Sequence, residues 1–343
     1  MTIEQIRNLI RGNEYDFLRT NEHLGDRIVF LTLGGSHAYG TNIETSDVDV
    51  RGCALNSPSD LIGMTNFEQV VNVETDTTVY SFNKLVGLLM SCNPNTIEML
   101  GCKPEHYIVQ TDIGREMIAN RKMFLSQKAV DSFGGYATQQ LRRLENALAR
   151  DRLPQTRQEE HVLHSMESAV RSFQDRYTQF DNSSISLYTA ESRRDDLDVE
   201  IFADIDLKKF PARDFSSILN DLSNVLTTYN KLNHRNHKKD NAHLNKHAMH
   251  LIRLYLMCLD ILEKEEIITY REKERPMLME IRNGKYMLED GTYSDEFFDM
   301  VSNFERRLQY AKKHTSLPAR PDFKRIQEFV MDVNRRSLSE LRN

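Results

Sequence analysis

The chain has few cysteines, and their spacing limits what they can do. Its 343 residues include four, none of them in a Cys-x-x-Cys pair. This spacing argues against the common cysteine-based zinc and redox motifs, and it indicates reduced thiols. We therefore expect a cytoplasmic protein. The four residues are Cys53, Cys92, Cys102 and Cys258.

Long apolar runs and surplus positive charge are also missing. No stretch of 18 apolar residues occurs, and Glu4 and Arg7 interrupt any leader-like N-terminus. We therefore expect no membrane span and no secretory leader. The formal net charge is −6. A broad nucleic-acid-binding surface is normally basic, so this charge argues against one and leaves only small basic patches as candidates.

The composition that is present is typical of a globular protein. Hydrophobic residues make up 39% and charged residues 28% of the chain, which argues against intrinsic disorder. A chain of 343 residues predicts about two domains. The composition changes near residue 125, so we expect a domain at 1–125 and a second at 126–343.

The most informative stretch runs from Leu31 to Gly52 and reads LTLGGSHAYGTNIETSDVDVRG. An apolar run ends in two glycines and a serine, and a second apolar run opens with Asp47-Val48-Asp49. Side chains alternate between the two faces of a strand. We therefore expect Asp47, Asp49 and Arg51 to share one face, with the valines on the other.

This combination of acids and glycines suits metal-dependent phosphate chemistry. Mg²⁺ usually binds one or two carboxylates together with substrate phosphates. Glycines let backbone N–H groups approach a phosphate, and a helix start adds its dipole. Each feature alone is common in turns and on solvated strands, but the two together favour a site. Glu74 and Asp76 are both candidates for a third carboxylate, because periodicity places them on one face of a strand at 67–80.

The stretch resembles the signature of the DNA polymerase β-like nucleotidyltransferases, in which Gly-Ser and a short helix precede Asp-x-Asp on the next strand. It is most similar to a branch with the patterns Gly-Ser-(Arg or His)-Ala-Tyr-Gly and Ser-Asp-x-Asp-x-Arg-Gly. These patterns occur here at Gly35–Gly40 and Ser46–Gly52. The resemblance implies that Asp47 and Asp49 are catalytic and bind metal.

The same resemblance implies roles for further residues. In this branch an acid precedes a Val-Tyr segment with a lysine beyond it, which favours Asp76 over Glu74 as the third catalytic metal ligand. The implied cofactor is a pair of Mg²⁺ or Mn²⁺ ions. The implied nucleotide-binding residues are Gly35, Ser36, Tyr39, Ser46, Arg51, Lys246, His250 and Arg253.

A second cluster lies on the helix predicted at 242–264. Lys246, His250 and Arg253 recur at i, i+4 and i+7, and therefore form one stripe. Apolar residues cover much of this helix, which indicates burial. Buried cations need anionic partners, either a nucleotide triphosphate or carboxylates of the protein. The pattern Lys-His-x-x-His-x-x-Arg-Leu resembles the same branch and favours the triphosphate.

The predicted fold class is α+β. We expect a nucleotidyltransferase core with a small mixed β-sheet and flanking helices, followed by an all-helical domain with a short hairpin near 185–202. Strands are predicted at about 27–33, 47–55, 67–80, 185–190 and 197–202. Helices are predicted at about 3–20, 81–91, 112–121, 127–150, 158–180, 214–232, 242–264, 275–283, 294–314 and 322–341.

The expected function is metal-dependent transfer of NMP from an NTP, with ATP favoured, to an acceptor hydroxyl such as an RNA 3′ end. Two alternatives stay open: an enzyme that transfers AMP to a protein, and a nucleotide-binding regulator without turnover. Three intact acids favour an enzyme, because a pure binder needs no third carboxylate. Small basic patches that could contact an RNA acceptor are Arg142-Arg143 and the loop 235–239.

Overall fold

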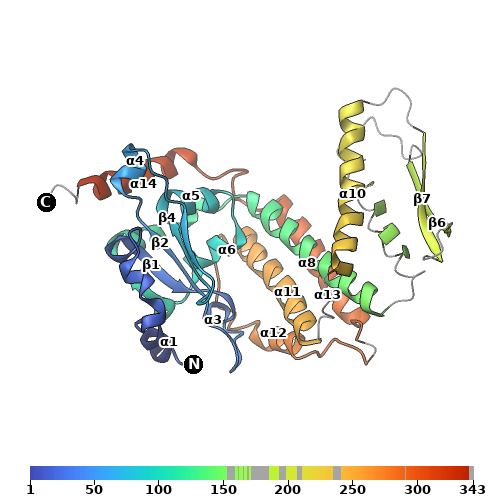
Figure 1. The fold of residues 1–343 in the computed structure, drawn as a ribbon, viewed down its shortest axis with the longest axis horizontal. Helices are drawn as coiled ribbons and strands as arrows, with labels where there is room; N and C mark the ends of the chain where they lie inside the picture. Colours follow the sequence, from blue (N-terminus) through green and yellow to red (C-terminus); the bar gives the residue numbers. More distant parts are fainter. Residues whose placement is uncertain are drawn as a thin grey trace. The chain divides into compact units, whose positions relative to one another are not determined.

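The structure is a computed structural model, and its packing divides the chain into two compact units (Figure 1). The first contains residues 1–139, 249–283 and 296–343, and the second contains 140–248 and 284–295. The domain boundary predicted between residues 125 and 126 stays a prediction. The structure describes residues 1–152, 159–160, 162–164, 166–167, 170, 185–192, 198–206, 211–234, 241–289 and 291–339.

A five-stranded mixed sheet forms the centre of the first unit (Figure 1). The strand order is β3-β4-β2-β1-β5, with β2 and β4 parallel and all other neighbours antiparallel. The end of β1 and the starts of β2 and β4 therefore meet at one edge of the sheet. The strands are β1 (Ile28–Leu33), β2 (Val50–Ala54), β3 (Gln69–Asn72), β4 (Thr77–Ser81) and β5 (Tyr107–Gln110).

Helices lie before, between and after these strands along the chain, and several begin at residues that cap them. Thr2, Ser57, Ser81 and Thr111 each accept a hydrogen bond from a backbone N–H of the following first turn. The helices are α1 (Ile3–Ile10), α2 (Phe17–Thr20), α3 (Gly35–Tyr39), α4 (Pro58–Ile62), α5 (Phe82–Met90), α6 (Pro94–Ile97), α7 (Asp112–Ala119), α8 (Lys128–Arg152), α11 (Asn241–Lys264), α12 (Arg275–Arg282), α13 (Asp295–His314) and α14 (Phe323–Ser339). Short 3₁₀ turns lie at Asn13–Tyr15, Gly25–Arg27, Glu98–Gly101, Pro104–His106 and Arg121–Phe124.

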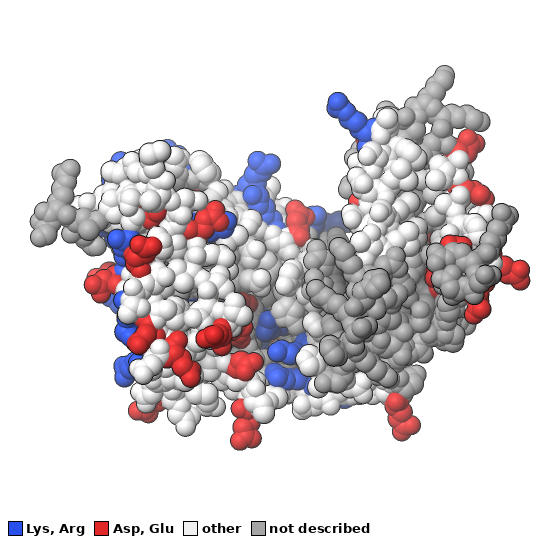
Figure 2. Space-filling model, viewed as in Figure 1, with Lys and Arg blue, Asp and Glu red and all other residues white. Residues whose placement is uncertain are grey.

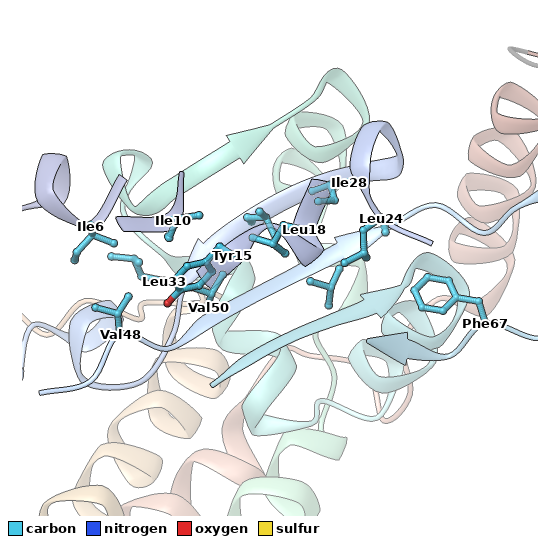
Figure 3. Close-up of a cluster of buried hydrophobic side chains, with 13 residues drawn as sticks. Ile6, Ile10, Tyr15, Leu18, Leu24, Ile28, Leu33, Val48, Val50 and Phe67 are labelled. Carbon is cyan, nitrogen blue, oxygen red and sulfur yellow. The ribbon is translucent and has the colours of Figure 1, made fainter. Parts of the chain in front are cut away.

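The N-terminal helices cover one face of the sheet. In Figure 3, Ile6, Ile10 and Leu18 point toward sheet residues that include Leu33 and Val50. All five side chains are buried. Burying a Leu, Ile or Val side chain is worth roughly 1.5–3 kcal/mol. This cluster therefore anchors the end of β1 and the start of β2, the two points between which the glycine turn lies.

The single helix predicted at 3–20 is wrong, because the structure breaks it into α1, a 3₁₀ turn and α2. The backbone of Gly12 is extended, and its N–H bonds to Leu9 instead of continuing the α-helical pattern. Glycine and asparagine are weak helix formers, and they follow each other at Gly12 and Asn13. The apolar period survives this break, which is why the sequence pattern did not reveal it.

The single strand predicted at 67–80 is also wrong, since this segment is a hairpin of β3 and β4. Asn72 ends β3, and its side-chain oxygen accepts hydrogen bonds from the Thr75 backbone, at 3.0 Å, and from the Thr75 hydroxyl. Such side-chain bonding stabilises a turn. Glu74 and Asp76 therefore lie in a turn and not on a strand face.

The prediction of an α+β core followed by a mostly helical region is confirmed. The strand predicted at 47–55 is shorter than expected, because β2 begins at Val50 and both acids precede it. Sequence analysis missed β5 and α4, which are only four and five residues long. The helices predicted after residue 180 all occur within a few residues of their expected bounds.

The second unit contains the later hairpin that the sequence predicted. Strands β6 (Ile185–Glu191) and β7 (Val199–Ile205) pair antiparallel, and α10 (Ala212–His234) follows them. Ile185 packs in a buried cluster with Ile218 and Leu222 of α10. Most of the helix predicted at 158–180, and the loop 235–239, lie outside the described residues.

Two further findings concern all described residues. No helix among them combines the length and the apolar character that a bilayer span requires. All four cysteines are unpaired thiols, and three of them are buried. The fourth, Cys102, is half-buried as a residue, but its thiol is shielded from solvent, and this desolvation raises its pKa to about 12, so the thiol is not activated as a nucleophile.

Candidate active site

The Gly34-Gly35 turn lies directly against Asp49. The Gly34 N–H donates a hydrogen bond of 2.8 Å to the Asp49 carbonyl, next to the register pair of Leu33 and Val50. Gly35 has a φ of +50°, and a Cβ built on it would lie 1.7 Å from Asp49 Oδ2. Glycine suits this position, because a Cβ would force the Asp49 carboxylate to shift and would strain the left-handed backbone.

The acids before β2 alternate with buried valines. Val48 and Val50 are buried, whereas Asp47 is exposed and the Asp49 side chain is 18% exposed. Both carboxylates therefore lie on the face opposite the hydrophobic cluster of Figure 3. This arrangement leaves Asp47 open to solvent and presses Asp49 onto the glycine turn.

Asp76 reaches the same edge of the sheet from β4. Its carbonyl accepts a hydrogen bond of 3.2 Å from the Val50 N–H, because β2 and β4 pair in parallel from Val50 and Thr77 onward. Its carboxylate forms an ion pair with Arg51, with Nη2 to Oδ1 at 2.9 Å. The same Arg51 nitrogen lies 3.9 Å from Asp49 Oδ1. Arg51 therefore joins the two carboxylates.

The negative charge at this edge of the sheet shifts the pKa of a buried tyrosine, Tyr15. Burial raises the pKa of the Tyr15 hydroxyl above its ordinary value. Carboxylates around it, Asp49 and Asp76 among them, raise that pKa further. Tyr15 also belongs to the hydrophobic cluster of Figure 3, so the acidic edge adjoins the core of the first unit.

The donor chemistry of this edge fits a divalent cation, although the acids do not form a complete set of ligands. Carboxylate oxygens of Asp47, Asp49 and Asp76 are ligands of the kind that Mg²⁺ takes. Among the described residues, however, no group of three or more His, Cys, Asp or Glu side chains is close enough to hold a metal. Asp76 is instead held by Arg51.

Helix α3, which follows the glycine turn, is anchored through Tyr39. The Tyr39 ring is buried, and its hydroxyl donates a hydrogen bond of 2.5 Å to Glu98. The guanidinium of Arg253 lies 3.6 Å from the ring centroid, in a cation–π contact. Burial raises the pKa of Glu98, while Arg253 and the bond from Tyr39 oppose that rise. Tyr39 therefore anchors α3 to Glu98 and Arg253 in the interior of the protein.

Three donors hold the chain immediately after α3. The Arg271 backbone N–H bonds to the Tyr39 carbonyl at 3.1 Å. The Arg275 side chain bonds to the Gly40 carbonyl at 2.7 Å, and that of Arg282 bonds to the Thr41 carbonyl at 2.6 Å. A backbone amide thus satisfies the carbonyl of the last residue of α3, and two guanidinium groups bind the carbonyls of the next two residues. Sequence analysis did not assign this role to residues 271–282.

The three residues of the predicted cation stripe on α11 lie in different surroundings. Lys246 is exposed and belongs to the second unit, whereas His250 and Arg253 belong to the first. His250 Nδ1 lies 2.7 Å from an Arg253 nitrogen. Glu98, which sequence analysis left without a site role, lowers the electrostatic cost of burying Arg253. For Arg253, the structure therefore shows a carboxylate of the protein as a neighbour.

The remaining predicted site residues lie on the same loop. Ser36 is half-buried, and its carbonyl accepts the Thr41 N–H at 2.9 Å, which closes α3. The Ser46 hydroxyl accepts the Ile43 N–H at 2.9 Å, which orders the approach to Asp47. The structure thus places Gly35, Ser36, Ser46, Asp47 and Asp49 on a single segment of chain, whereas Asp76 lies on the separate turn before β4.

Charge on the visible face is mixed. Figure 2 shows acidic and basic side chains interspersed over the described part of the first unit on that face. Of the two predicted basic patches, Arg142-Arg143 lies on α8, and the loop 235–239 lies outside the described residues. This mixture suits a small contact with an acidic polymer better than a wide one.

Comparison with known families agrees with the site. Residues 11–166 match the model of a family described as the RNA repair pathway DNA polymerase beta family (RlaP). A search of curated proteins found no match. The matched region includes the glycine turn and all three acids, but not α11. The resemblance to a DNA polymerase β-like family is therefore confirmed, and it indicates a nucleotidyltransferase.

The close approach of Gly35 to Asp49 predicts that adding a methyl group at residue 35 lowers the stability of the protein. Gly35→Ala should destabilise the protein by about 1–2 kcal/mol from the left-handed backbone alone, with a further cost from displacing the carboxylate. Gly87→Ala is the matched control, because Gly87 lies within α5 and a Cβ there meets nothing within 4 Å. Gly87→Ala should stabilise by roughly 0.5–1 kcal/mol. Urea unfolding of both variants measures the difference, and equal stabilities would contradict the geometry.

Proposed function

We propose that this chain transfers NMP from an NTP, preferably ATP, to an acceptor hydroxyl. The observation that carries the proposal is the Gly34-Gly35 turn packed on Asp49, with Asp76 at the same edge of the sheet. A turn of this kind suits phosphates, and the adjacent carboxylates suit cations that accompany phosphates. The matched family, described as DNA polymerase beta-like, supports the same chemistry.

In this proposal the three acids are the ligands of two Mg²⁺ or Mn²⁺ ions. Asp47 and Asp49 bind from the segment before β2, and Asp76 binds from the turn before β4. When bound, such ions neutralise phosphate charge and polarise the oxygens around the α-phosphorus. Gly35 and Ser36 hold the β- and γ-phosphates through backbone and hydroxyl donors.

The reaction exchanges one bond to phosphorus for another. The acceptor oxygen forms a bond to the α-phosphorus, and the bond from that phosphorus to the pyrophosphate oxygen breaks. Asp76 accepts the proton of the acceptor hydroxyl, and pyrophosphate leaves with the electron pair of the broken bond. The protein contributes mainly by positioning and by electrostatic stabilisation, as in other phosphoryl transfers.

Other predicted residues act on this centre in different ways. Arg51 binds phosphate oxygens, while Ser46 orders the segment that leads to Asp47. Tyr39 and Arg253 hold α3 in place from the interior. His250 contacts Arg253, and the phosphate-binding role of Lys246 rests on the pattern in the sequence.

For the acceptor we favour an RNA 3′ end bound through few phosphates. The matched family's description refers to an RNA repair pathway, and the net charge of −6 speaks against a long basic groove. Transfer of AMP to a protein hydroxyl is the second candidate, since a protein acceptor requires no basic surface on a chain with a net charge of −6. The unpaired cysteines are in keeping with a cytoplasmic location, which we also propose.

Removal of the acids tests the catalytic proposal. Asp47→Asn combined with Asp49→Asn should lower Mg²⁺-dependent transfer by roughly a hundredfold or more. The melting temperature should stay the same or rise, because neighbouring carboxylates repel one another. Transfer is measured with labelled ATP and melting by calorimetry. Retained activity would refute the assignment, and a large loss of stability would indicate a structural role.

The hairpin turn offers a matched pair that separates its two acids. Asp76→Asn should abolish transfer, whereas Glu74→Gln, two residues away on the same exposed turn, should leave the rate near that of the wild type. Both substitutions remove one charge and preserve side-chain size. A larger loss of rate in Glu74→Gln would exchange the roles of the two acids.

The salt dependence of RNA binding tests the size of the acceptor site. Each phosphate neutralised on a single strand contributes a slope of about −0.7 to log K against log salt. We expect roughly two to four neutralised phosphates, and therefore a shallow total slope. Fluorescence anisotropy over a salt series measures it. A slope several-fold steeper would show an extended basic groove, and protein labelling without RNA labelling would favour the second candidate.

A further inference from the structure

Arg51 holds the position between two acids that a bridging cation would take. Its Nη2 lies 2.9 Å from Asp76 Oδ1 and 3.9 Å from Asp49 Oδ1. Its other terminal nitrogen donates to the Val50 carbonyl at 3.0 Å and also to the Asp76 carbonyl. Four oxygens around one guanidinium therefore include a carboxylate oxygen from each acid.

A guanidinium and a divalent ion cannot both use these oxygens. Mg²⁺ binds oxygen ligands at about 2.1 Å and demands near-ideal geometry. An ion that joined Asp49 Oδ1 to Asp76 Oδ1 would meet the Arg51 nitrogen that already lies near both, and the two positive charges would repel. The arginine and the metal are therefore alternatives at this position.

A second position for the Arg51 guanidinium lies nearby, over the glycine turn. A Cβ built on Gly34 would lie 3.0 Å from Arg51 Cγ, so the arginine stem passes directly over the glycine turn. That turn is where the proposed function puts the nucleotide phosphates, and a guanidinium fork matches phosphate oxygens well. The Asp76 side chain is 58% exposed, and exposed ion pairs are weak, so the contact between the two side chains can be exchanged for a phosphate. The hydrogen bonds from Arg51 to the Val50 and Asp76 carbonyls still hold the guanidinium against a metal ion that offers it no new partner.

We propose that Arg51 is a resident cation that blocks the metal position until nucleotide phosphates draw it away. This inference rests on the proposed function and adds that tight metal binding requires the nucleotide to be bound. Metal alone binds weakly, because it must displace the guanidinium. Nucleotide phosphates attract Arg51 and release Asp76, so nucleotide and metal strengthen each other's binding. Such coupling is reciprocal by thermodynamic necessity.

Mn²⁺ binding without nucleotide tests the exchange, measured by the loss of the paramagnetic resonance signal of the unbound ion. Arg51→Gln should bind Mn²⁺ at least about tenfold more tightly than the wild type, and Arg51→Lys should lie between them. Arg19→Gln is the matched control, because Arg19 also joins backbone carbonyls to an acid, Asp16, at 2.5 Å. It should bind Mn²⁺ as the wild type does.

A double variant locates the gained affinity. Arg51→Gln combined with Asp76→Asn should lose the tighter Mn²⁺ binding, because the released carboxylate is gone. Retention of the gain would place the ion elsewhere and overturn the inference. Circular dichroism of each variant confirms folding, and Arg51→Lys keeps the test valid where the glutamine variant does not fold.

Thermal melting with Mn²⁺ and a non-hydrolysable ATP analogue separates this inference from the proposed function. In the wild type the two ligands together should raise the melting temperature by more than the sum of their separate effects, and in Arg51→Gln the effects should be additive. Equal Mn²⁺ affinities of wild type and Arg51→Gln, with stabilisation by the pair intact, would overturn the exchange alone. Absence of stabilisation by the pair in every variant would overturn the exchange and the proposed function together.

Discussion

The approach of Asp49 to the glycine turn is the constraint on which the candidate site depends. The segment from Gly34 to Asp49 leaves one strand and enters its antiparallel neighbour, so its two ends meet at the pair of Leu33 and Val50. A hydrogen bond from the Gly34 N–H to the Asp49 carbonyl closes the loop. The Asp49 carboxylate then occupies the space that a side chain on Gly35 would need. This hydrogen bond and this packing together hold the proposed phosphate-binding turn against the proposed cation-binding carboxylate.

This constraint is supported by residues far away in the sequence. Arg271, Arg275 and Arg282 donate to three successive carbonyls at the end of α3 and just beyond it. Arg271 is itself buried and paired with Asp260. Breaking a buried pair on one side commonly costs about 3–5 kcal/mol. The first unit therefore needs its C-terminal segments to fix α3, which explains why that unit includes residues 249–283 together with the sheet.

The glycine turn and the acids could be predicted from sequence because their signals are local. Alternation around Val48 and Val50 indicated which side chains face the core, and their burial confirms that pattern. The hairpin at Asn72–Asp76 could not be predicted in the same way, because no glycine or proline marks its turn and only the Asn72 side-chain bonds reveal it. The donors of residues 271–282 carry no local signal, since a surface arginine and a carbonyl-bonding arginine look alike in sequence.

The role of Arg51 shows a different limit of sequence reasoning. The pattern places Arg51 on the same face as Asp49, but it gives no sign that the arginine also reaches Asp76. That contact depends on the parallel pairing of β2 with β4, which brings residue 76 beside residue 50. A pairing between strands distant in sequence thus decides which acid the arginine neutralises.

Transfer of label from ATP tests the central claim most directly. Two parallel reactions would use ATP labelled at the α-phosphate and at the γ-phosphate, with Mg²⁺ and with total RNA or total protein as acceptor. The account predicts that α-label becomes attached to the acceptor while γ-label is released as pyrophosphate. Attachment of γ-label, or no attachment of α-label to either acceptor, would contradict a nucleotidyltransferase built on the glycine turn and its three acids.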